Sequence, residues 1–308
     1  MAEAQQPAGR RDRHDPRTWR GIFVIPQTPF DDDGELDLEG LRRVVDFSIE
    51  AGAHGIVYPV MASEFFTLTD AERLRTIPLV VEQVAGRCPV VIGVAGVSTP
   101  AAVQFARAAQ EAGADAVIAM PPYVQKYRDE EIVRYYAAID RVVHVPIFIQ
   151  NAGLAAMSRP LVLKLVREIE QIHFVKEEVA PAHHSIGALV AAGEPRLWGV
   201  FGGHGGQNLI QELRRGAAGN MPGAGFTDIL VRIFELWEVG RRAEAEQLHR
   251  RLAPLMARAG PMKEILVKRG VIASARTRGA GGPAFDDEDR RERDAFWPEL
   301  AAEFTWRP

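Results

Sequence analysis

The stretch Gly52-Ala53-His54-Gly55-Ile56-Val57 returns in similar form as Gly113-Ala114-Asp115-Ala116-Val117. In each copy, small residues close a helical stretch, the chain turns, and an apolar strand begins. A sequence motif that twice combines a helix end, a turn and a strand start predicts an architecture of repeated strand–helix units.

Short apolar runs alternate with amphipathic stretches on both sides of these copies. Strands that are nearly all apolar are typical of a parallel sheet covered on both faces. Eight strand–helix units within about 200 residues predict an α/β fold, a closed (β/α)₈ TIM barrel. An open doubly wound sheet is the alternative, but no GxGxxG motif follows the first strand. The expected strands are residues 21–26, 54–60, 89–94, 115–120, 145–150, 172–176, 196–201 and 219–221.

The predicted domain organisation has three parts. Residues 1–20 are polar, with arginines interleaved with acids and without the apolar segment of a signal peptide, so we expect a disordered leader. Residues 21–226 are expected to form the barrel. From Thr227 onward the pattern is helical only, which predicts a C-terminal helical extension over residues 227–308.

Composition excludes several classes of function. The 308 residues carry a net charge of −4 and no basic tract in the ordered part, which argues against a nucleic-acid partner. The single cysteine, Cys88, allows no intrachain disulfide and fits a reducing cytoplasm. No apolar run reaches the roughly 18 residues needed to span a bilayer. His183 and His184 are adjacent and would not face one ion on a helix, so we expect no metal.

Lys176 is the strongest chemical signal in the chain, because it ends the apolar run that starts at Ile172. Burial disfavours an ammonium ion and so favours the free amine that attacks a carbonyl carbon to form an imine. Side chains alternate along a strand, so Glu178 should share the face of Lys176 and Glu177 should point away. The alternative is a solvated salt bridge at a strand end.

Further candidates follow the other strands, because the active site of such a barrel lies at the carboxyl ends of its strands. They are Ser63 and Glu64 after the second strand, Tyr123 after the fourth and Gln150 at the end of the fifth. Gly203 belongs to the loop 202–206, whose backbone amides could hold an anionic group. Ordinary loops are the alternative in each case, and His204 in the same loop is expected to be exposed.

Several motifs occur in the order and spacing of a known family. They are Pro29-Phe30-x-x-x-Gly34, Leu68-Thr69-x-x-Glu72-Arg73, Gly113-Ala114-Asp115-Ala116 and Phe174-Val175-Lys176-Glu177. With them, the chain from Gly21 to about Gly270 resembles the dihydrodipicolinate synthase / N-acetylneuraminate lyase superfamily of class I Schiff-base barrels. The resemblance implies that Lys176 forms the imine with a 2-keto acid substrate, without a cofactor, in a homodimer or homotetramer.

The departures from the family pattern narrow the expected activity. The positions of the synthases' Thr, Tyr, Tyr proton relay are Met61, Val124 and Gln150, which carry no hydroxyl. The arginine that holds the synthases' second substrate falls at about Ala155. Both changes argue against dihydrodipicolinate synthase activity.

A branch of the superfamily, the L-2-keto-3-deoxyarabonate dehydratases, is more similar. It shares Ser63-Glu64-x-Phe66, Ala119-Met120-Pro121-Pro122-Tyr123, a glutamine at Gln150, Lys-x-Glu at Lys176 and Glu178, and Gly270-Val271-Ile272-Ala273-Ser274. We therefore expect a dehydratase of a 2-keto-3-deoxy sugar acid. Its catalytic residues would be Lys176 and Glu178, and Ser63, Glu64, Gln150, Tyr123 and Gly203 would bind the substrate. A class I aldolase that releases pyruvate and a non-catalytic small-molecule sensor are the alternatives.

Overall fold

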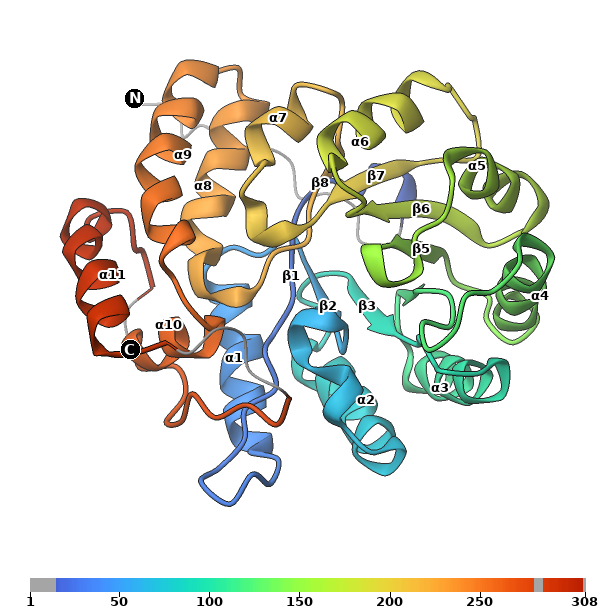
Figure 1. Ribbon diagram of the computed structural model, residues 1–308, viewed down its shortest axis with the longest axis horizontal. Coiled ribbons are helices and arrows are strands. Elements are labelled where there is room, and N and C mark those ends of the chain that lie inside the picture. The colour runs from blue at the N-terminus through green and yellow to red at the C-terminus, as the bar shows by residue number, and fades with distance from the viewer. Residues whose placement is uncertain (1–14, 280–284, 307–308) are drawn as a thin grey trace, which may run out of the picture.

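The computed structural model describes residues 15–279 and 285–306, and the predicted closed barrel is confirmed (Figure 1). All neighbouring strands are parallel, and β1 pairs with β8 to close the sheet. The strands are β1 (Gly21–Val24), β2 (Gly55–Tyr58), β3 (Val90–Gly93), β4 (Ala116–Ala119), β5 (Ile147–Asn151), β6 (Ile172–Glu177), β7 (Gly199–Gly202) and β8 (Gly219–Asn220).

The helices surround the strands (Figure 1), and capping side chains mark the start of several of them. Asp37 accepts a hydrogen bond from Gly40 N at the start of α1, and Thr69 forms a capping box with Glu72 at the start of α2. The barrel helices are α1 (Leu38–Glu50), α2 (Asp70–Val84), α3 (Thr99–Ala112), α4 (Asp129–Asp140), α5 (Arg159–Glu168), α6 (Ala182–Ala191), α7 (Leu209–Leu213) and α8 (Thr227–Glu238).

The barrel interior is filled by a layer of aromatic rings from several strands. Phe148 and Phe174 stack with ring centroids 4.3 Å apart, and Phe23 meets Phe201 edge-on at 5.0 Å. Residues two positions further along β5 and β6 point the same way, so Gln150 and Lys176 lie above this layer. The aromatic layer thus forms an apolar floor beneath the two polar side chains.

Residues 15–20 correct the prediction of a disordered leader over residues 1–20. Pro16–Thr18 form a 3₁₀ helix, and Trp19 is buried against Phe148 and Phe174. A large ring that covers the open end of the aromatic layer gains enough buried apolar surface to hold this segment in place. Residues 1–14 lie outside the described residues.

Three further helices follow α8: α9 (Arg242–Ala257), α10 (Met262–Lys268) and α11 (Asp287–Leu300) (Figure 1). Helix α9 packs against α8, and α11 packs against α9. Helix α8 contributes Ile229, Ile233 and Phe234 to the core that the strands and helices share. It occupies the place of the eighth barrel helix, and we propose that the extension begins after Glu238 rather than at Thr227.

Strand β7 starts later than expected, at Gly199 instead of Arg196. The Arg196 guanidinium donates to the carbonyl oxygens of Val166, Ile169 and Glu170, so this residue holds the preceding turns instead of joining the sheet. Within residues 15–279 and 285–306, none of the helices has the length and apolar character that a membrane crossing requires.

Candidate active site

Lys176, Glu178 and Gln150 meet at the carboxyl ends of β5 and β6. Lys176 Nζ lies 3.0 Å from Glu178 Oε2, and Gln150 Nε2 donates to the same oxygen at 2.9 Å. Lys176 is only 2% exposed, and Gln150 is equally buried. A buried amine, a carboxylate and an amide therefore share one point above the aromatic floor, which differs from the solvated salt bridge considered as the alternative.

The sheet register explains why these groups meet. Gln150 and Lys176 are Cα partners in the β5–β6 ladder, and Asn151 and Glu177 are the next pair. The first pair points into the barrel, and the second points to the opposite face. Asn151 Nδ2 donates to Glu177 Oε2 at 2.8 Å, and Val179 N donates to Glu177 Oε1 at 2.8 Å. Glu177 therefore braces the end of β6 and Glu178 faces the amine, as the alternation predicted.

The two adjacent glutamates differ in acidity. Burial raises the pKa of Glu178. The Lys176 charge and the hydrogen bonds from Gln150 and Lys176 lower it by more than burial raises it, so the pKa lies below its usual value. Burial also raises the pKa of Glu177, and there the bonds from Asn151 and Val179 leave a net increase. Glu178 is thus the carboxyl group that stays ionised beside the amine.

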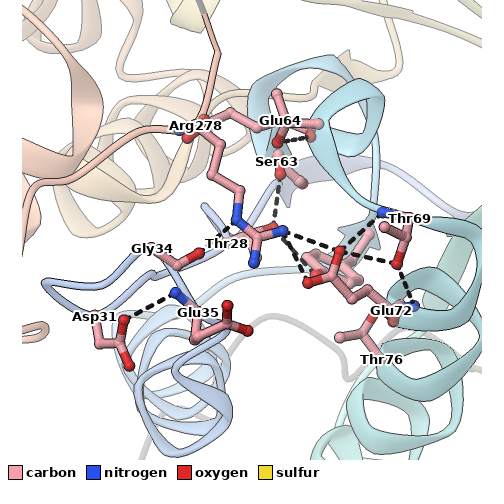
Figure 2. Close-up of polar contacts among 12 residues, drawn as sticks. Thr28, Asp31, Gly34, Glu35, Ser63, Glu64, Thr69, Glu72, Thr76 and Arg278 are labelled. Carbon is pink, nitrogen blue, oxygen red and sulfur yellow. Dashed lines mark hydrogen bonds and ion pairs between the residues drawn. The ribbon is translucent and has the colours of Figure 1, made fainter.

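The segment after β2 is held by hydroxyl groups (Figure 2). Ser63 Oγ donates to Pro26 O at 2.8 Å, and Thr28 Oγ1 donates to Ser63 O at 2.6 Å. Tyr58 Oη lies 3.1 Å from the same Thr28 oxygen. The hydroxyl hydrogen of Ser63 is thus used within the protein, and its predicted contact with the substrate would have to involve its lone pairs or neighbouring backbone amides.

Glu64 is held by the C-terminal part of the chain. Lys263 Nζ, on α10, lies 2.5 Å from Glu64 Oε1, and Arg278 N donates to Glu64 Oε2 at 3.1 Å. The Arg278 guanidinium reaches from Gly34 O to the Glu72 carboxylate, as Figure 2 shows. The C-terminal segment thereby joins the segments that follow β1 and β2. Lys263 and Arg278 escaped the sequence analysis because their partners lie some 200 positions earlier in the chain.

An apolar wall lies on the segments after β2, β3, β4 and β5. Its members are Met61, Phe65, Ala95, Met120, Tyr123, Ala152 and Ala155. Tyr123 meets Phe65 edge-on at 5.8 Å, and burial raises the pKa of its phenol despite the Arg73 charge. Arg73, another residue that the sequence analysis did not assign, donates to Ala95 O and Gly93 O and lies over the Phe105 ring.

The glycine-rich segment after β7 lies against Glu178. A Cβ atom on Gly203 would come within 2.2 Å of Glu178 Oε1, so only glycine leaves room for the carboxylate there. His204 is exposed as predicted, and its Nε2 lies 2.9 Å from Glu178 O. Within residues 15–279 and 285–306, no group of three His, Cys, Asp or Glu side chains could hold a metal ion.

Several known proteins are similar to this chain in sequence and fold. The model of the dihydrodipicolinate synthetase family matches residues 18–283. The L-2-keto-3-deoxyarabonate dehydratase of Azospirillum brasilense is 35% identical over 270 residues, which are 84% of this chain and 87% of that protein. The probable 2-dehydro-3-deoxy-D-pentonate aldolase YjhH of Escherichia coli K12 is 30% identical over 246 residues, 78% of this chain and 82% of that one. The crystal structure of dihydrodipicolinate synthase from Rhodopseudomonas palustris is similar with a TM-score of 0.83 at 29% identity, over 91% of this chain and 97% of that one.

Proposed function

The chain belongs to the dihydrodipicolinate synthetase family of lyases and aldolases, and we propose that it is a Schiff-base dehydratase of a 2-keto-3-deoxy sugar acid. The five-carbon acid L-2-keto-3-deoxyarabonate, which would give 2-oxoglutarate semialdehyde, is the substrate best supported. The observation that carries this proposal is the contact of Lys176 Nζ and Gln150 Nε2 with one oxygen of Glu178.

The first step would be imine formation at Lys176. The ammonium group must lose a proton before it can attack, and Glu178 Oε2, 3.0 Å away, is placed to accept it. The free amine then adds to the C2 ketone of the substrate, and Glu178 gives its proton to the hydroxyl group of the adduct, which leaves as water. An iminium ion and an ionised Glu178 remain. This cation withdraws electrons from C3 and so acidifies the C3 protons.

The second step would be elimination across C3 and C4. Glu178 takes a C3 proton to form an enamine, and the enamine electrons expel the C4 hydroxyl group. Glu178 returns its proton to that hydroxyl, which leaves as water. Tautomerisation and hydrolysis of the imine release 2-oxoglutarate semialdehyde and regenerate Lys176. The net change is the loss of one water molecule, with no oxidation.

Gln150 supports elimination over carbon–carbon cleavage. Cleavage requires a base that removes the proton of the C4 hydroxyl, and a carboxamide cannot act as one. In the proposed reaction Gln150 holds Glu178 through its Nε2 and could hydrogen-bond a substrate hydroxyl. The similarity to the probable pentonate aldolase of E. coli keeps an aldolase as the second candidate.

The surroundings favour a substrate with one carboxylate and a neutral far end. The cations Arg73, Lys263 and Arg278 are each bound to protein carbonyl or carboxylate groups. Backbone amides around Ser63 would hold the single carboxylate, and Tyr123 of the apolar wall would contact the carbon chain. The predicted homo-oligomer and the cytoplasmic location stay predictions.

Product analysis tests the proposal. The protein is incubated with L-2-keto-3-deoxyarabonate. Pyruvate is assayed with lactate dehydrogenase, and 2-oxoglutarate semialdehyde is trapped as a derivative and identified by mass spectrometry. The dehydratase proposal expects semialdehyde without pyruvate. Pyruvate as the main product would establish the aldolase instead, and the absence of both products with this acid and its C4 epimer would remove both candidates.

A further inference from the structure

Glu212 is a buried carboxyl group that the proposed reaction does not use. It lies on α7, behind the strands β7 and β8, and is 0% exposed. The backbone of Gly202 packs directly on it, since a Cβ atom there would come within 1.9 Å of Glu212 Oε2. A carboxyl group enclosed in this way needs a compensating hydrogen bond.

Asn220 on β8 connects Glu212 to the catalytic side chains. Its Nδ2 donates to Glu212 Oε2 at 2.8 Å and to Gly203 O at 2.9 Å. Gly203 in turn packs against the Glu178 carboxylate. The connection from Glu212 through Asn220 and Gly203 therefore ends at the proposed base.

Two atoms of this connection lack a hydrogen-bond donor. Glu212 Oε1 and Asn220 Oδ1 are both buried and have no hydrogen-bond partner among the described residues. A proton on Glu212 would provide the missing donor, because a carboxylic acid and a carboxamide can form two parallel hydrogen bonds. An ionised Glu212 would leave both oxygens without one.

The electrostatic surroundings also favour the neutral acid. Burial raises the pKa of Glu212 to about 7; the Asn220 bond opposes the increase, and the Glu178 charge adds to it. The titratable or charged groups on the adjoining elements include Lys176, Glu177 and Glu178 at the end of β6, His183 and His184 on α6, His204 after β7, Arg214 and Arg215 after α7, and Arg242, Glu244, Glu246, His249, Arg250 and Arg251 on α9. Among these, the Glu178 charge acts on Glu212.

We propose that Glu212 is a positioning residue that, as a neutral acid paired with Asn220, holds the Gly202–Gly203 backbone against Glu178. The proposal rests on the assignment of Glu178 as the base. When Glu212 ionises, its Oε1 can no longer donate to Asn220 Oδ1, and the repulsion between these two oxygens loosens the contact of Asn220 with Gly203. Turnover should then fall as the pH rises through about 7.

The variants Glu212→Gln and Glu212→Leu test this role. Glutamine keeps the neutral pair, so its turnover number should match the wild type at pH 6 and show no decline near pH 7. Leucine removes the pair and should lower kcat about tenfold with KM little changed. Both should still be trapped by borohydride with pyruvate. Glu246→Gln, which removes a partly exposed carboxylate on α9 that pairs with Arg214, is the matched control.

A second measurement keeps this proposal separate from the proposed function. The pKa of Glu212 is higher in the folded chain than the ordinary 4.5, so the folded state should lose stability relative to Glu212→Gln as the pH rises from about 4.5 to 7. The proposal would be overturned if the free energy of unfolding of wild type and Glu212→Gln varied with pH in the same way. It would also be overturned if Glu212→Gln showed the same decline in kcat near pH 7 as the wild type. Wild type that fails to dehydrate any substrate but shows the stability difference would overturn only the assigned reaction.

Discussion

Gln150 lies directly across from Lys176 in the parallel pair of β5 and β6, and both side chains contact Oε2 of Glu178, at 2.9 and 3.0 Å. The register of two strands thus places an amide and an amine on one carboxylate oxygen. Because the amide can donate but cannot take a proton, Glu178 and not Gln150 is placed to act as a base beside Lys176. This arrangement is the physical basis on which we propose elimination rather than cleavage.

Glu178→Gln should separate imine formation from dehydration. The amide retains the size of the side chain but cannot remove the C3 proton, and loss of a general base typically costs about 10²–10⁴ in rate. Trapping by borohydride with pyruvate should persist while semialdehyde formation is largely lost. Glu177→Gln, on the opposite face, is the matched control and should cost much less. A larger loss in the Glu177 variant would show that the base has been assigned to the wrong residue.

Gln150→Ala should move the acid limb of the pH–kcat/KM profile. The wild-type limb should lie below pH 4.5, because the Lys176 charge and the Gln150 bond outweigh burial and lower the pKa of Glu178. Removing the Gln150 bond removes one of the lowering effects, so the limb should shift to higher pH. The rate is measured across the pH range with limiting substrate, which gives kcat/KM, and with saturating substrate, which gives kcat. An unchanged limb would mean that Glu178 is not the group that titrates.

Lys263→Met should raise KM more than it lowers kcat. The substitution leaves the Glu64 carboxylate without its 2.5 Å partner and loosens the segment after β2 that is expected to hold the substrate carboxylate. Because the two residues are in contact, the double variant with Glu64→Gln should recover part of the loss, with a coupling of about 0.5–3 kcal/mol. Additive effects of the two substitutions would indicate that the ion pair does not position this segment.

Asp228→Ala should destabilise the fold strongly. Asp228 and Arg269 form a two-bond ion pair at 2.9 and 2.7 Å with both side chains buried, and Asp228 also accepts from Thr305 N. Its removal leaves the guanidinium buried without a counter-ion, which costs about 3–5 kcal/mol of unfolding free energy. Urea denaturation measures the change. Glu244→Ala, from an exposed pair, should leave the transition almost unchanged, and equal effects would contradict the assigned burial.

Local sequence patterns predicted the features that depend on neighbouring residues. The period of two along β6 was enough to place Glu178 beside Lys176 and Glu177 on the other face, and the succession of eight strand–helix units was enough to predict the closed barrel. Contacts between distant segments were not predicted. Lys263 pairs with Glu64, which lies some 200 positions earlier in the chain, and Trp19 enters the barrel from a segment that is otherwise polar. Neither contact leaves a periodic signal in the sequence.

Glu212 shows the same limit inside the site. Its position on a short helix, in the run Leu209–Leu213, looks like that of an ordinary solvent-facing glutamate. Only the close packing of Gly202 and the double donation by Asn220 show that it is enclosed. The sequence shows that residues 202 and 203 are glycines, but it does not show that Glu212 and Glu178 pack against them.

The central claim is that Lys176 forms an imine with the sugar acid before water is lost. Borohydride reduction during turnover of L-2-keto-3-deoxyarabonate, followed by peptide mass spectrometry, tests it most directly. The account predicts a reduced adduct on the peptide that contains Lys176 and none in Lys176→Ala, which should also lose turnover while remaining folded. An adduct on another lysine, or full turnover in Lys176→Ala, would contradict it.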